Sequence, residues 1–189
     1  METVYVLDVA TREELREWFI ANHDTCNEVW VVCNRSKCAA GCGLPYFDVV
    51  YEALCFGWID STCKRIGDRM LQRLTPRRAG SNWTELNKER CRYLERCGLM
   101  TDAGRKVLPG DMCEESFEAD EDIVMELRKD PVVAANFERF PELYKRVRIG
   151  NIRMKRGDEV MYRRRLDKFI EYTRRNVMYG NWNDDGRLL

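Results

Sequence analysis

The sequence predicts an α+β protein, with a small mixed α/β N-terminal domain that contains a β-hairpin and an all-helical C-terminal region. Three observations predict this class. Apolar residues recur at helical spacing near the N-terminus, two strand-like runs flank a turn at 66–68, and the second half carries helix-start signals. With 189 residues, 44% of them apolar, the chain is long enough to bury a core.

The N-terminal elements begin with a helix. Thr11 and Glu14 form the pattern of a capping box, and apolar residues then recur at helical spacing, so we expect a helix over 12–22. The run 29–33, VWVVC, is β-branched and aromatic, which favours a buried strand. A second helix follows, and Gly57 is a suitable cap at its C-terminal end.

A hairpin and a further helix come next. The strand-like runs 58–63 and 70–75 flank a turn at 66–68, which predicts a β-hairpin. Beyond it, apolar residues on one stripe predict a third helix that ends at Gly98. A short helix is expected near 102–108.

The second half begins after an acidic stretch. Residues 111–122, DMCEESFEADED, hold seven acidic residues and no basic one, which is typical of a solvated linker or a helix entry. Asp130-Pro131, Pro141 and Gly157-Asp158 are helix-start or helix-separating signals. The predicted organisation is a domain over 1–110, an acidic linker over 111–122, a helical region over 123–180 and a flexible tail over 181–189.

Composition restricts the classes of partner. The 32 basic and 32 acidic residues cancel, so global charge does not favour nucleic acid or a membrane. No window approaches the roughly 18 apolar residues needed to cross a bilayer. Acidic residues interrupt the first twenty positions, unlike a secretory signal, so we expect no membrane span and a cytoplasmic location.

The nine cysteines raise the question of a metal site. Cys33, Cys38 and Cys42 could hold a metal together with Cys26 or His23, which is the sole histidine of the chain. Structural zinc sites usually show two pairs of closely spaced ligands, and here only Cys38 and Cys42 approach that spacing. Ordinary reduced thiols are therefore favoured, and we expect neither a metal nor a cofactor.

Several motifs occur in order along residues 51–92. They are ALCFGWIDS, a basic hairpin, TPRRAGSNW and the NKER opening of the next helix. Together they resemble the YdeI/OmpD-associated, or bacteriocin-protection, family, and the stretch DPVVAANFERFPELYKRVRIGNI is similar to the C-terminal helical part of its longer members. The resemblance implies a stress or envelope-protection role without a defined reaction. The insert at 38–42 departs from the family pattern, so no role is carried over to its cysteines.

A polar cluster beside two tryptophans is the candidate binding site. Its members come from a strand start, a Pro-Arg turn and a helix entrance: Trp58, Asp60, Ser61, Arg77, Arg78, Ser81, Trp83 and Asn87. Arg77 offers a planar fork for a carboxylate or phosphate, and the amides of the helix start would add donors. The alternative, which the need to satisfy buried polar groups favours, is a brace in which Asp60 pairs with Arg77.

Function is therefore a choice between hypotheses from different classes. The leading one is a non-enzymatic stress or envelope-protection protein that binds a small anionic ligand or an anionic group on a protein partner. Enzyme activity is disfavoured, because His23 has no evident serine or cysteine partner.

The alternative is a nucleic-acid-binding module on the basic C-terminal helices. Residues 145–175 hold twelve basic and four acidic residues. The arginines that would contact phosphates are Arg163, Arg164, Arg165, Arg174 and Arg175. A solvated or internally paired face is favoured over nucleic acid, because the acidic residues of 111–122 are available as partners.

Overall fold

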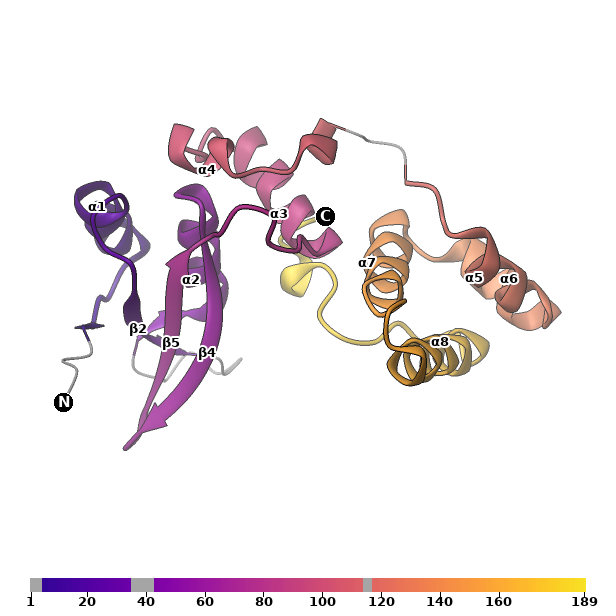
Figure 1. Ribbon diagram of the computed structural model, residues 1–189. Coiled ribbons are helices and arrows are strands. Elements are labelled where there is room, and N and C mark those ends of the chain that lie inside the picture. Colours follow the sequence, from indigo (N-terminus) through magenta and orange to yellow (C-terminus); the bar gives the residue numbers. More distant parts are fainter. Residues whose placement is uncertain (1–4, 35–42, 114–116) are drawn as a thin grey trace. The chain divides into compact units, whose positions relative to one another are not determined.

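The computed structural model describes residues 5–34, 43–113 and 117–189, and its fold is α+β (Figure 1). The chain forms two compact units. The first consists of Met1–Asn82 and Arg90–Gly110, and the second of Trp83–Glu89 and Asp111–Leu189. The chain passes between the units three times, and the predicted boundary near residue 110 coincides with the third passage, while the segment 83–89 belongs with the C-terminal unit.

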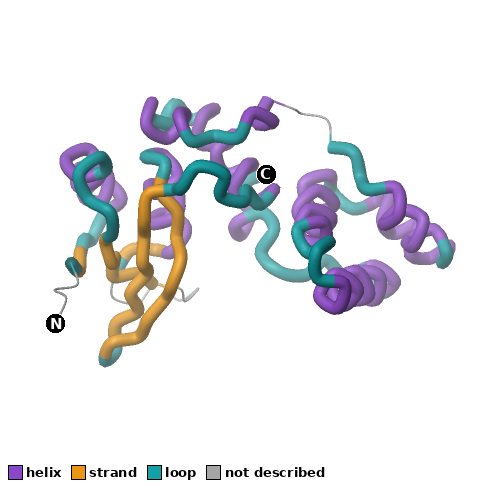
Figure 2. Tube along the Cα trace, viewed as in Figure 1, coloured by secondary structure: helices purple, strands orange, loops and turns teal. Residues whose placement is uncertain are grey.

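A mixed sheet organises the first unit (Figure 2). Its strands are β1 (Val6–Leu7), β2 (Val29–Asn34), β3 (Leu44–Pro45), β4 (Trp58–Ile66) and β5 (Arg69–Pro76). The order is β1-β2-β5-β4, with β3 also paired to β2. Strands β4 and β5 are the predicted hairpin, and their register shifts between Asp60 and Cys63. Gln72 donates its amide to the Thr62 carbonyl at this irregularity, 3.2 Å away, which satisfies that acceptor.

Two helices, α1 (Arg12–Asn22) and α2 (Tyr46–Cys55), form the core of this unit together with the sheet. Helix α1 has the predicted bounds, because the capping box of Thr11 and Glu14 is formed. Helix α2 packs against the sheet, as Figure 1 shows. The core is apolar and aromatic: Leu15, Phe19, Val29, Val31, Val49, Val50, Ala53, Leu54, Trp58 and Leu74.

A buried carboxylate joins α1 to α2. Glu52 is 1% exposed, and it accepts from Arg12 Nε at 2.5 Å and from Arg16 Nη1 at 2.9 Å. Arg16 Nη2 also donates to the Leu99 carbonyl, 2.8 Å away. A buried carboxylate is tolerated only when it is paired in this way, so this cluster fixes the relative position of the two helices.

Two further helices follow the hairpin, α3 (Glu85–Arg96) and α4 (Asp102–Lys106). Gly98 has a φ of +67°, which suits its predicted place after α3. Thr101 caps α4 and also donates to the Cys55 carbonyl at 2.6 Å. A Cβ on Gly104 would lie 2.3 Å from that carbonyl oxygen, so glycine permits the close approach of α4 to α2.

The second unit is helical, as predicted. It contains the start of α3 and, among the described residues, four complete α-helices: α5 (Glu121–Arg128), α6 (Pro131–Arg139), α7 (Glu142–Arg153) and α8 (Glu159–Arg174). A short 3-10 helix, η1 (Gly110–Cys113), precedes α5, and another, η2 (Asp184–Gly186), follows α8. Asp130 and Asp158 accept from the first backbone N–H groups of α6 and α8. The core includes Ile123, Leu127, Phe137, Tyr144, Ile149, Leu166 and Phe169, and Leu86 of α3 packs against it.

The C-terminal residues differ from the predicted flexible tail at 181–189. Trp182 and Leu188 are 9% and 6% exposed, and the Trp182 ring meets Tyr144 edge-on at 5.5 Å. Asp184 is fully buried. Short polar sequences rich in Asn, Asp and Gly are typical of mobile tails, but here the Trp182 indole belongs to the helical core and attaches the segment to it.

Candidate functional site

The turn after β5 is built around Arg77, which is 6% exposed. Its Nη1 donates to Ser81 Oγ at 3.3 Å and to the Asn82 carbonyl at 3.1 Å. Its backbone N–H donates to the Gly57 carbonyl at 2.9 Å. Burial lowers the pKa of the guanidinium, while Cys91 and Asp60 act in the opposite direction. Arg77 therefore braces the turn in which the TPRRAGSNW motif lies.

A surface hollow of about 690 Å³ adjoins this turn. Its lining comes from the segment before β2, from β4, and from β5 with the turn that follows it: Asn27, Glu28, Ile59, Arg73, Thr75, Pro76, Arg77, Arg78 and Ser81. Three of the residues singled out in the sequence, Arg77, Arg78 and Ser81, thus line one hollow. Arg73 and Glu28 join them, although the sequence analysis did not identify either.

Charge in the hollow is predominantly positive. Arg73 Nε donates to Glu28 Oε2 at 2.6 Å, and Trp30 Nε1 donates to Glu28 Oε1 at 2.9 Å. The hydrogen bond from Arg73, followed by that from Trp30, lowers the pKa of Glu28. Arg78 is exposed and forms no ion pair within the described residues. Three guanidinium groups therefore share the hollow with one carboxylate, whose charge Arg73 already neutralises.

The other strand residues of the predicted cluster have different roles. Trp58 is 1% exposed, and its indole N–H donates to the His23 carbonyl at 3.1 Å, so it belongs to the core. Asp60 accepts from the Tyr46 hydroxyl at 2.7 Å, a partner that the sequence analysis did not consider for it. Ser61 Oγ donates to the Arg73 carbonyl at 3.4 Å across the hairpin. None of these three side chains is among those that line the hollow.

The remaining two members of the cluster, Trp83 and Asn87, fall in the second unit. Asn87 is 8% exposed, and its backbone N–H donates to Thr84 Oγ1 at 3.1 Å at the start of α3. The hollow consists only of first-unit residues. The geometry therefore supports a site smaller than the predicted cluster, centred on the Pro-Arg turn.

The candidate metal ligands are only partly described. Cys38 and Cys42 lie outside the described residues. His23 ends α1, with Nδ1 2.9 Å from the Phe19 carbonyl oxygen, and Cys33 is buried on β2. Over residues 5–34, 43–113 and 117–189, the structure contains no group of three His, Cys, Asp or Glu side chains arranged to hold a metal ion.

Comparison with known families gives one match. Residues 7–107 match the model described as a domain of unknown function, DUF8412, which spans more than half of the chain. The chain belongs to the DUF8412 family. The matched residues include strands β2 to β5, helices α1 to α4 and the hollow, and the match begins at the second residue of β1. No curated protein and no solved structure matches the DUF8412 chain.

Beyond the DUF8412 match, the C-terminal arginines mostly have internal partners. Arg163 pairs with Asp167 at 2.8 Å. Arg174 pairs with Asp130 at 2.9 Å, and Arg175 lies 3.6 Å from Glu171. Arg165 donates to the Asn151 carbonyl. Of the five arginines proposed as phosphate contacts, only Arg164 has a side chain that forms neither an ion pair nor a hydrogen bond with any described residue.

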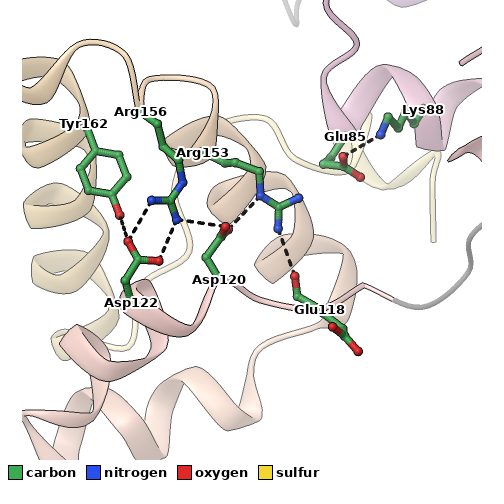
Figure 3. A network of polar contacts seen from close by, with 8 residues as sticks. All are labelled: Glu85, Lys88, Glu118, Asp120, Asp122, Arg153, Arg156 and Tyr162. Atoms are coloured by element: carbon green, nitrogen blue, oxygen red, sulfur yellow. Dashed lines mark hydrogen bonds and ion pairs between the residues drawn. The ribbon is translucent and has the colours of Figure 1, made fainter.

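The end of the acidic segment binds basic residues of α7 and of the α7–α8 turn (Figure 3). Asp120 accepts from Arg153 Nε at 2.8 Å and from Arg156 Nη2 at 3.0 Å. Asp122 accepts from Arg156 Nη2 at 2.7 Å and from the Tyr162 hydroxyl at 2.7 Å. The hydrogen bonds from Arg156 and Tyr162 lower the pKa of Asp122 to about 2, and burial with the bond to Asp122 raises that of Tyr162 to about 12. Asp120 and Asp122 are therefore ion-paired although Asp122 stays exposed, and the segment leads into α5, which is the helix entry expected as one of the two alternatives for this stretch.

Among the described residues, no helix is both long enough and apolar enough to cross a bilayer.

Proposed function

We propose that this DUF8412 protein binds a small anion, or an anionic group on a protein partner, in the hollow beside β5. The observation that carries the proposal is the convergence of Arg73, Arg77 and Arg78 on one hollow, where Glu28 is the single carboxylate among the described lining residues. Guanidinium groups bind carboxylates and phosphates through paired N–H donors, and such charge-assisted bonds are about twice as strong as neutral ones.

Arg78, Arg77 and Ser81 would contribute differently. The exposed guanidinium of Arg78 is the group available for direct contact. Arg77 is buried in the turn and supplies a fixed positive charge behind the hollow. Ser81 accepts a hydrogen bond from Arg77, which leaves its own hydroxyl proton to donate to an anion. The site thus combines one adaptable charge, one fixed charge and one neutral donor.

Binding without catalysis is the form of this proposal that the side chains support. Among the described residues that line the hollow, the only carboxylate, Glu28, is held by Arg73 and Trp30 and so is not free to act as a general base. The motifs in residues 51–92 that resemble YdeI/OmpD-associated proteins lead us to propose a stress or envelope-protection role for the binding. A cytoplasmic location is part of the same proposal, and cell fractionation with an antibody tests it.

Thermal shift against a panel of anions tests the binding. The panel contains phosphate, sulfate, citrate and nucleoside monophosphates at constant ionic strength. A ligand present at a hundred times its Kd stabilises the native state by about 2.7 kcal/mol, which moves the melting temperature by several degrees. Arg78→Gln should abolish the shift, while Arg65→Gln should retain it, because Arg65 is also an exposed arginine but lies outside the hollow.

Two results would count against the proposal. One is the absence of stabilisation across the panel. The other is an equal loss of the shift in both variants, which would indicate a general charge effect rather than a site.

A further inference from the structure

The outer face of α8 carries a second hollow, of about 790 Å³. It is lined by Val160, Arg163, Arg164, Asp167, Lys168, Glu171 and Tyr172. Arg164 and Lys168 are four residues apart, so they lie on the same side of the helix, separated by a rise of about 6 Å. The two side chains thus form a short row of cations along an exposed helix face.

The charges on this face do not cancel evenly. Asp167 is paired with Arg163 at 2.8 Å, and Glu171 lies 3.6 Å from Arg175. Each carboxylate of the lining therefore has its own arginine. Arg164 and Lys168 form no ion pair with any carboxylate in the part of the chain that the structure describes. The face keeps two positive charges without internal partners.

Lys168 contacts two tyrosine rings rather than a carboxylate. Its ammonium nitrogen lies 4.9 Å from the centre of the Tyr179 ring and 5.6 Å from that of Tyr172, and the two rings are 4.6 Å apart. A cation over an aromatic ring is positioned without being neutralised. Arg148 also lies over the Tyr179 ring, with Cζ 4.7 Å from the ring centre. The cluster therefore combines fixed positive charge with aromatic surface.

We propose that this face of α8 binds single-stranded nucleic acid without sequence preference, with Arg164 and Lys168 as phosphate contacts and Tyr172 beside them. The hollow is open rather than enclosed, and its cations lie in a row, which suits a chain with repeating phosphates better than a single small anion. Neighbouring aromatic rings and cations are the groups that single-strand binders use for bases and backbone.

The proposed phosphate contacts differ from those expected from the sequence. Of the five arginines considered from the sequence, Arg164 is retained, and Lys168 is added because its partners are rings rather than carboxylates. The site belongs to the second unit and shares no residue with the hollow of the first unit. It therefore stands or fails independently of the proposed anion binding.

Fluorescence anisotropy of a labelled oligo-dT strand, titrated with the full-length protein at 50–200 mM salt, tests the inference. Two phosphate contacts predict a slope of log Kobs against log salt of about −1.4, or roughly sevenfold weaker binding over that range. We expect a Kd on the order of 10⁻⁵ M at the lower salt concentration. The double variant Arg164→Gln/Lys168→Gln should weaken binding at least about tenfold and remove most of the salt dependence.

A matched control separates a site from a general loss of charge. Arg128→Gln/Arg139→Gln removes two exposed cations from the same unit, neither of which lines the hollow or pairs with a carboxylate among the described residues. This variant should bind within twofold of the original protein. Circular dichroism confirms that both variants are folded.

Three outcomes would overturn the inference. They are no binding at 50 mM salt, equal weakening in the two double variants, or binding by the original protein of anionic phospholipid vesicles but not of oligo-dT. In the last case the same cations would serve a lipid surface.

Discussion

Glu52→Gln removes the buried carboxylate that Arg12 and Arg16 share. The wild-type side chain accepts two charge-assisted hydrogen bonds, of 2.5 and 2.9 Å, and each such bond contributes about 1.5–3 kcal/mol. The two arginines keep 25% and 28% of their side-chain exposure, so they can turn partly to water after the change. We therefore expect the low end of the sum, a loss of about 3 kcal/mol in the free energy of unfolding.

Urea denaturation followed by far-ultraviolet circular dichroism measures this loss. The midpoint should fall while the slope with urea stays constant, because the change affects stability and not the surface exposed. For a unit of this size, about 3 kcal/mol also corresponds to a melting temperature roughly 10–20 °C lower. Glu17→Gln, an exposed glutamate on α1, should change the free energy by less than about 0.5 kcal/mol.

Replacing the whole cluster distinguishes charge pairing from packing. The triple variant Arg12→Met/Glu52→Leu/Arg16→Met removes every charge and keeps similar volume, so it should recover most of the stability lost in Glu52→Gln. A loss below about 1 kcal/mol in Glu52→Gln would refute the reasoning, because it would mean that water replaces the carboxylate without cost.

Three further predictions concern other parts of the molecule. The pKa of Asp122, near 3.8 in the unfolded chain, falls to about 2 in the folded protein, so its contribution is present above about pH 4 and lost as the pH falls towards 2; urea midpoints between pH 2 and 5 should vary less in Asp122→Asn. Gly104→Ala should destabilise by about 1–3 kcal/mol in the same assay, because its Cβ meets the Cys55 carbonyl, while Gly157→Ala, with open space around it, should not destabilise. Burial raises the pKa of the Cys55 thiol to about 11, so iodoacetamide at pH 8 followed by mass spectrometry should label exposed Cys97 and spare Cys55 until the protein unfolds.

Local signals explain which elements could be predicted. The capping box of α1, the hairpin turn and Gly98 after α3 act over three or four residues, so they can be found without knowledge of the tertiary structure. Strand β1 was missed because two residues carry no readable alternation, and it exists only by pairing with β2. Helix α5 begins inside the predicted linker, since Glu121 and Asp122 are acidic residues in a first turn, where the helix dipole favours them.

The candidate site could be predicted only where its residues are neighbours in sequence. Arg77, Arg78 and Ser81 belong to one turn, and the motif identified them together. Glu28 and Arg73 are 45 residues apart and meet because β2 pairs with β5 in a particular register. Hydrophobic pattern and turn geometry decide the register of paired strands. A charged residue in or beside a strand therefore does not indicate which residue of another strand it will meet. Trp58 was assigned to the site but belongs to the core. A tryptophan next to polar residues in sequence can also be buried, provided that its indole N–H finds one acceptor, which here is the His23 carbonyl.

Helix α3 crosses from one compact unit to the other, and this has a consequence for dividing the protein. Its first residues contribute Leu86 to the core of the C-terminal unit, and the Cγ of Glu85 would lie 2.5 Å from a Cβ on Gly150. A fragment that starts at residue 111 would therefore expose part of that core, although it contains every later helix. During synthesis the same residues are made before the rest of the first unit is finished and before α5 to α8, so the C-terminal unit completes its core with a segment that precedes it in the chain.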